Sequence, residues 1–364
     1  GGGGGGGEGG GGGGGGGGGS GAKEKEKKKE AAQPGEAEEP PSKEEQKKKP
    51  EEEELRRGRE GEDPEKKPVP KRFASTKDAL GASEDALKGM RGSVGEVGAS
   101  AEKMAKVGGA LANGDDWQTR MAVPVSQAAD IAADFHDKAG TGLSNFTEAH
   151  AVLGAANADL VAASAFLDTA ITGLGQRAAQ YEGESKAPPS ALKTDQALQS
   201  AESRLVMADG QKAAADQAIR AGDRSVFPPA LAEDAKPSVV EQRTEAAALV
   251  KELPKPLAGP GSQPLTTLKG LETAQKTLDT AVIKAGTAAD TLRVAAATVD
   301  TAKTKLEGAL DEAKTVKREM DELDAELDIA PDPETLKEEK VPPLRERLER
   351  ARSLVRSAMP PKNP

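Results

Sequence analysis

Between Leu271 and Leu327, apolar and small residues recur at spacings of three and four without interruption. A repeat of this kind forms one stripe along a helix, and we call that stripe a heptad seam; it is typical of a helix that lies along another helix. The larger side chains recur every seven residues: Leu271, Leu278, Ala285, Leu292, Val299, Leu306, Ala313, Met320 and Leu327. The smaller ones follow three residues later, beginning with Ala274 and Ala281. The seam indicates architecture and carries no direct sign of chemistry.

A second heptad seam lies earlier in the chain and has the same register. It contains Phe146, Leu153, Leu160, Leu167 and Leu174, with alanine three residues after most of these positions. Each long helix is expected to extend roughly 85 Å at about 1.5 Å per residue. Their matched lengths predict that the two helices lie side by side within one molecule.

Composition supports an all-α fold. Aromatic residues make up only 2% of the chain and cysteine is absent, so the bulky side chains that fill a β-sandwich or barrel are scarce. Alanine lets helices approach closely but buries little area, so two helices alone would be marginally stable. We therefore predict an elongated three- to four-helix bundle or antiparallel coiled coil with Leu/Ala heptads, preceded by a long disordered tail.

Residues 1–72 are predicted to be that tail. Eighteen of the first nineteen residues are glycine, which has maximal backbone freedom and no side chain to bury. Residues 22–72 then carry 16 basic and 16 acidic side chains, interrupted by prolines. Such a segment buries too little apolar surface to offset its ordering entropy, which predicts a disordered tether and charged linker.

Residues 73–330 are predicted to form the bundle. Proline, glycine and capping residues place its helices at about 73–112, 125–182, 190–221, 238–253 and 264–329, with the four longer ones running alternately. The first helix is expected to be weak because it contains many glycines. Pro124 is interpreted as a helix boundary or kink. Asp332 and Pro333 are interpreted as the cap and first-turn proline of a short helical segment. Residues 331–364 are also predicted to hold a short basic helix, opening at Pro343, and a tail.

The net charge of −10 disfavours nucleic acid as a partner, because phosphate binding needs a basic surface. No run of about 18 uncharged apolar residues is present, so no conventional transmembrane helix is predicted. No secretory signal is recognisable, and the chain begins at Gly1 rather than Met. The location therefore stays open between the cytoplasm and secretion by a route without a visible signal peptide.

Few residues suggest chemistry. His136 and His150 are fourteen residues apart on one helix, a separation of about 21 Å, so they cannot share a metal ion. We interpret both as structural residues, with pH sensing at a helix interface as the alternative. Asp115 and Asp116 are typical of a helix start. The acidic run from Asp321 to Asp328 lacks the order of a calcium-binding loop. We therefore predict no catalytic, cofactor or metal site.

Two segments raise a membrane alternative. Residues 149–174 are nearly all small or apolar but include Asp159 and Asp168, which are costly in lipid, so bundle core is the preferred interpretation over conditional insertion. The C-terminal basic helix could contact anionic lipid through its arginines, although packing of its leucine face is favoured. The membrane is therefore a possible partner that the sequence does not support directly.

These observations predict a non-enzymatic structural or interaction protein, a spacer, scaffold or assembly component that contacts helices of its own or another protein. No small-molecule substrate is predicted. The first alternative is a secreted or injected helical effector, possibly membrane-active. The second is an enzyme whose site forms only on folding.

Overall fold

The structure is a computed structural model that describes residues 73–183, 190–227 and 238–360. The predicted disordered tail, residues 1–72, lies outside the described residues. Six α-helices and no strand occur among the described residues, which confirms the all-α helical bundle. The helices are α2 (Thr76–Leu111), α3 (Asp116–Tyr181), α4 (Ala191–Val226), α5 (Val239–Glu252), α6 (Gln263–Leu327) and α7 (Pro333–Ala358).

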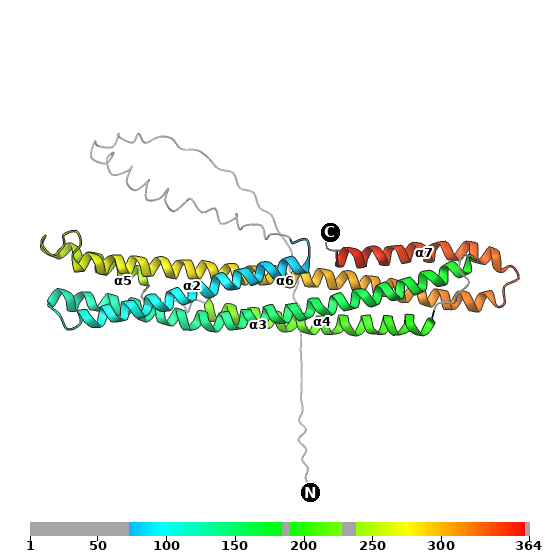
Figure 1. Cartoon of the computed structure of the whole chain (residues 1–364), viewed down its shortest axis with the longest axis horizontal. Coiled ribbons are helices and arrows are strands. Elements are labelled where there is room, and N and C mark those ends of the chain that lie inside the picture. Colours follow the sequence, from blue (N-terminus) through cyan, green and yellow to red (C-terminus); the bar gives the residue numbers. More distant parts are fainter. Residues whose placement is uncertain (1–72, 184–189, 228–237, 361–364) are drawn as a thin grey trace, which may run out of the picture. The chain divides into compact units, whose positions relative to one another are not determined.

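The two long helices, α3 and α6, are the common framework of the bundle. They run in the same direction, since Gln118 contacts Gln263 at their N-terminal ends and Arg177 contacts Asp321 at their C-terminal ends (Figure 1). They also pack directly against each other. Alanines in both heptad seams permit this close approach.

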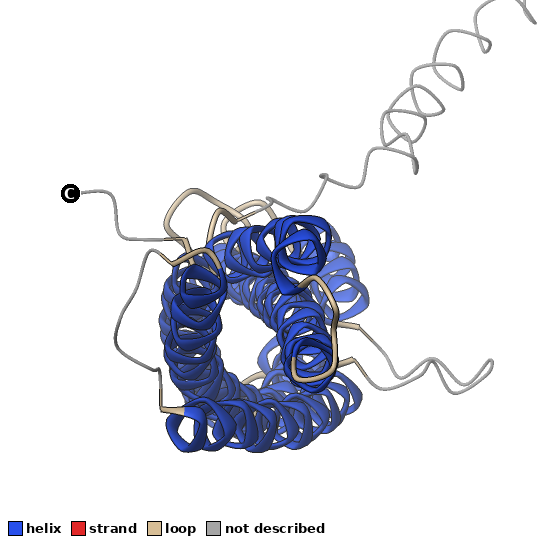
Figure 2. Cartoon of the chain, turned by 90° about the vertical axis from the view of Figure 1, so that its right-hand side faces the viewer, coloured by secondary structure: helices blue, strands red, loops and turns tan. Residues whose placement is uncertain are grey.

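The shorter helices occupy the other two positions around this pair. α4 and α5 both pack on α3 and α6, and they follow one another along the bundle. α2 and α7 share the remaining position in the same way, each packing on α3 and α6. Among the described helices, α2 does not contact α4, so these two lie at opposite corners of the four-helix cross-section. Figure 2 looks along the bundle and shows its helices running side by side.

Helices at adjacent corners of the cross-section are antiparallel, whereas α3 and α6 are parallel, as the predicted alternation requires. In the α2–α3 pair, the Thr76 hydroxyl donates a hydrogen bond to Asn157, and the Ser83 hydroxyl lies 2.9 Å from His150 Nδ1. Residue numbers rise along α2 as they fall along α3, so these two helices run in opposite directions. α2 is a continuous helix despite its glycines. Its buried side chains, among them Leu87, Met90 and Val97, pack against the framework and offset its poor intrinsic propensity.

Two predicted helix starts are wrong, and both errors involve proline. The helix predicted from residue 125 begins at Asp116, and Pro124 lies inside it. The short segment expected from Pro333 and the helix expected from Pro343 form one helix, which begins at Pro333 with Asp332 as its N-cap, so Pro342 and Pro343 lie inside it. A proline inside a helix costs about 3 kcal/mol. Burial of apolar neighbours offsets that cost: Met121 and Val125 around the first proline, and Val341 and Leu344 around the other two.

The remaining helix limits differ by smaller amounts. The predicted 190–221 helix continues to Val226, and the others end within a few residues of their predicted positions. At the α3–α4 crossing the backbones come close, because a Cβ atom on Gly142 would lie 3.1 Å from the carbonyl oxygen of Gly222. A Cβ atom on Gly222 would overlap the ring of the fully buried Phe146. Glycine at 222 therefore creates the space that Phe146 fills.

Candidate functional site

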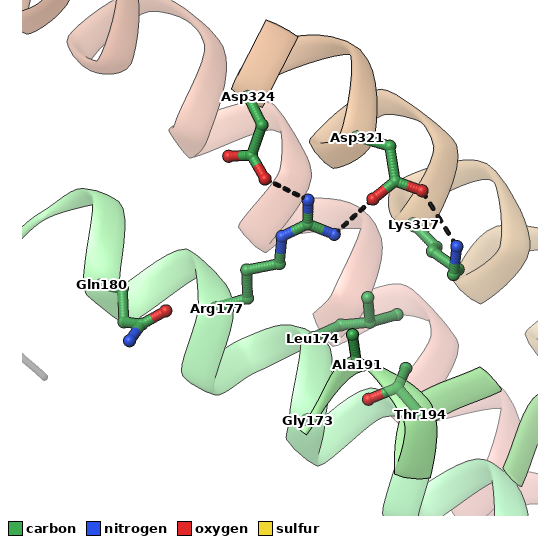
Figure 3. A pocket seen from close by; sticks show the side chains of 9 residues that line it. All are labelled: Gly173, Leu174, Arg177, Gln180, Ala191, Thr194, Lys317, Asp321 and Asp324. Atoms are coloured by element: carbon green, nitrogen blue, oxygen red, sulfur yellow. Dashed lines mark hydrogen bonds and ion pairs between the residues drawn. The ribbon is translucent and has the colours of Figure 1, made fainter. Parts of the chain in front are cut away.

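A cluster of charged and polar side chains joins the C-terminal ends of α3 and α6. Arg177 donates to Asp321 at 2.6 Å and to Asp324 at 2.5 Å, and also to the carbonyl oxygen of Met320 at 3.2 Å (Figure 3). Tyr181, one turn further along α3, donates its hydroxyl to Asp324 Oδ1 at 2.6 Å. A single guanidinium and phenol thus hold two carboxylates on the neighbouring helix. We call this group the Arg177 cluster.

Lys317 connects the cluster to α4. Its ammonium group lies 2.9 Å from Asp321 and 3.3 Å from Asp195. Beside these side chains is a cleft of about 260 Å³ whose walls come from α3, α4 and α6. The cluster therefore joins three helices at one level of the bundle.

Burial and pairing shift the pKa values in the cluster. Burial raises the pKa of Asp321, but hydrogen bonds from Lys317 and Arg177 outweigh this and leave it below its ordinary value of 3.8. Burial, together with donation to Asp324, raises the pKa of the Tyr181 hydroxyl well above its usual range. The hydrogen bond to Asp321 raises the pKa of Lys317. Each group is held in its ordinary charge state at neutral pH, which suits a structural tie between helices.

We expect Arg177→Gln to destabilise the bundle by about 1 kcal/mol at pH 7, because it removes the shared partner of Asp321 and Asp324, which are about half exposed. The pKa of Asp321 is lower folded than unfolded, so its contribution is present above the unfolded value near 3.8 and is lost as pH falls through the folded value. The difference between wild type and variant should therefore shrink below about pH 4. Urea unfolding at pH 7 and pH 3 measures it, and an equal difference at both values would contradict the assignment.

A second ion pair ties α3 to α4. Asp159, only 6% exposed, accepts a hydrogen bond from Arg204 at 2.7 Å. The ion pair explains why an acidic residue is tolerated within the apolar run of residues 149–174. The buried carboxylate has a charged partner, so it does not face lipid or an apolar core unpaired. The sequence singled out Asp159 only as costly, and nothing in it identified Arg204 or Arg177 as partners.

Both histidines lie at the α2–α3 interface. His150 Nδ1 is 2.9 Å from the Ser83 hydroxyl, which also donates to the carbonyl oxygen of Leu80. His136 packs against Gly98, where a Cβ atom would lie 2.7 Å from the imidazole ring. Both side chains thus contribute to helix packing.

The other candidate residues fall on ordinary structural contacts. Asp115 is the N-cap residue of α3. In the acidic run, Asp321 and Asp324 belong to the Arg177 cluster, Glu322 pairs with Arg318, and Glu326 pairs with Lys340. Within the described residues, no group of three or more histidine, aspartate or glutamate side chains is placed to hold a metal ion.

The predicted seam residues lie at the interface between helices. Ten of the twelve are buried, and Leu278 and Leu327 are half-buried. The buried ones are Leu271, Leu292, Val299, Leu306, Met320, Phe146, Leu153, Leu160, Leu167 and Leu174. They take part in two clusters of buried side chains that follow each other along the framework.

The basic C-terminal helix packs on the bundle through its apolar face. Leu344, Leu348 and Ala351 are buried. Its arginines form ion pairs along the same interface: Arg347 with Glu319 at 2.6 Å and Arg350 with Glu312 at 3.1 Å. Of the arginines considered for lipid contact, Arg347 and Arg350 thus neutralise acidic side chains of α6, and Arg345 pairs with Glu182.

Among the described residues, one helix, α3, is long and apolar enough to cross a membrane by length and composition. The same properties occur in core helices of soluble bundles, and α3 contacts every other described helix.

Comparisons with known proteins found no match, so a function can be assigned only from the fold and the geometry of its contacts. No family model, curated protein or solved structure matches this chain.

Proposed function

We propose that this protein is a non-enzymatic helical scaffold, a spacer or assembly component that acts through helix packing. One observation carries the proposal: α3 and α6 are parallel, contact each other directly and are bonded to each other at both ends. With 66 and 65 residues, each helix extends about 98 Å at about 1.5 Å per residue.

The reason this arrangement suits a spacer is mechanical. An isolated helix of this length curves and frays, because most helical stability in proteins comes from tertiary packing. Here four helix positions surround the apolar seams, and the ties at both ends resist sliding of α3 along α6. A stiff body of this kind holds bound partners at a set separation.

Single-molecule energy transfer between dyes on Gln127→Cys and Asp168→Cys tests this property in the full chain, which has no native cysteine. These positions are both exposed on α3, and 41 residues separate them by about 62 Å. We expect one narrow distance distribution near that value. A broad or multimodal distribution in folded molecules would contradict the spacer, because it would indicate bending within α3.

A further inference from the structure

Helix α2 differs from the other described helices in its polar contacts. Ion pairs join each of α3 to α7 to another helix. The ion pairs of α2 instead stay within the helix, between Lys88 and two neighbouring carboxylates. In the part of the chain that the structure describes, only Thr76 and Ser83 of α2 form hydrogen bonds with another helix, and both lie in the first quarter of α2. The rest of α2 is held in place by packing.

The glycines of α2 weaken the helix without serving its packing. Alanine is favoured over glycine in a helix interior by up to about fivefold per residue. Four glycines of α2 are exposed, and no atom lies within 4 Å of a Cβ built on them: Gly81, Gly92, Gly95 and Gly109. We call these the open glycines of α2. The longer helices α3 and α6 contain only two such positions each, so α2 has a lower intrinsic stability than its packing requires.

The contact between α2 and α3 is also incompletely filled. A groove of about 510 Å³ lies between these helices and is lined mostly by glycine and alanine, together with His136. Two carboxylates, Glu102 of α2 and Asp130 of α3, line the same groove, and neither has an ion-pair partner among the described residues. Unfilled volume forfeits packing contacts and like charges repel, so both features make α2 easier to detach.

We propose that α2 is a releasable helix, which detaches from α3 and α6 and unfolds while the other described helices stay folded. Buried side chains such as Leu87, Met90 and Met104 keep the closed state predominant, so the open state is a minor one. In the open state, part of the apolar cluster that α2 shares with α3 and α6 becomes accessible. The proposal goes beyond the scaffold function and does not depend on it.

The position of α2 in the chain gives its release a use. Residues 1–72 precede α2, so they connect to the bundle through this helix. A partner that binds or pulls residues 1–72 therefore acts first on the helix that is most easily released. Release would then link an event on that segment to exposure of apolar surface on the bundle.

Hydrogen exchange of the full chain at pH 7 tests the release. Opening of α2 does not require global unfolding, so its amides can exchange while the other helices remain protected. We expect residues 87–104 of α2 to exchange about a hundredfold faster than residues 303–320 of α6.

Two matched fourfold variants separate release from global unfolding. The test variant combines Gly81→Ala, Gly92→Ala, Gly95→Ala and Gly109→Ala, and it should slow exchange in α2 about a hundredfold, because each alanine favours the closed helix. The control variant makes the same change at four positions on other helices that also have no atom within 4 Å of a built Cβ: Gly140→Ala, Gly154→Ala, Gly210→Ala and Gly270→Ala. The control should leave exchange in α2 unchanged, because those helices stay folded in the open state.

Thiol labelling measures the release independently, because the chain has no native cysteine. Ser93→Cys on α2 and Ala218→Cys on α4 place single thiols at positions that are 7% and 8% exposed. We expect the thiol at position 93 to react about a hundredfold faster, since it alone becomes accessible when α2 opens.

Three results would overturn the proposal: exchange in α2 as slow as in α6, α2 exchange that the test variant does not slow or that both fourfold variants slow equally, and similar labelling of the two thiols. Each would mean that α2 opens only with the whole bundle. If the energy-transfer distribution were narrow in that case, the release alone would be wrong. Release of α2 together with a broad distribution would overturn only the spacer.

Discussion

Gly222→Ala is expected to destabilise the bundle by about 1–3 kcal/mol, the usual cost of inserting a methyl group into a packed core. The added Cβ would overlap the ring of Phe146, which is fully buried. Helix propensity alone predicts the opposite sign, since alanine is favoured over glycine by up to about 1 kcal/mol in a helix. Urea unfolding measured at one low protein concentration distinguishes the two effects.

Gly210→Ala is the control for this prediction. It lies on the same helix with open space around its Cβ position, so the folded monomer should be unchanged or more stable by up to about 1 kcal/mol. Equal effects of the two substitutions would show that close packing at Gly222 does not limit stability.

Replacing both Leu292 and Leu306 with aspartate should unfold the bundle. Both side chains are fully buried in the α6 seam. Truncating each costs about 2–5 kcal/mol, and each new carboxylate adds the cost of burying a charge, so the total exceeds the stability of a typical domain. Circular dichroism should show most of the helical signal lost at 25 °C.

Ile283→Asp provides the comparison for this pair. It introduces the same side chain into the same helix at an exposed position, so helicity and thermal midpoint should stay close to those of the wild type. If the double aspartate variant kept wild-type helicity and thermal stability, the α6 seam would not be the buried contact that holds the framework together.

The Arg177 cluster and the alanine seams contribute differently to the framework. Alanines let α3 and α6 approach closely along their length but allow one helix to slide against the other, because neighbouring heptads are nearly equivalent. The Arg177 contacts to Asp321 and Asp324 specify a single register. This is the best-attested role of polar groups at helix interfaces, where they select one arrangement from several of similar energy.

The fold class, the approximate helix lengths and the buried faces of the long helices follow from the sequence alone. A seven-residue repeat places Leu153, Leu160 and Leu292 on one side of their helices whatever lies opposite, and an alanine-rich composition favours helix over strand. Helix starts at the prolines do not follow from local rules, because burial of Met121 or Val341 outweighs the local cost of a proline within the helix.

Only the tertiary structure decided how the shorter helices are placed around the two long ones. A heptad seam identifies the residues that face a neighbouring helix, but it does not identify that helix. All the seams present similar leucine and alanine side chains, so one helix could pack on several others equally well. Matched lengths already predicted that α3 and α6 lie side by side, but the shared positions of α4 with α5 and of α2 with α7, and the Arg177 cluster, depend on that choice. Contacts such as Arg177 with Asp321 join residues 144 apart in sequence, and no local pattern specifies them.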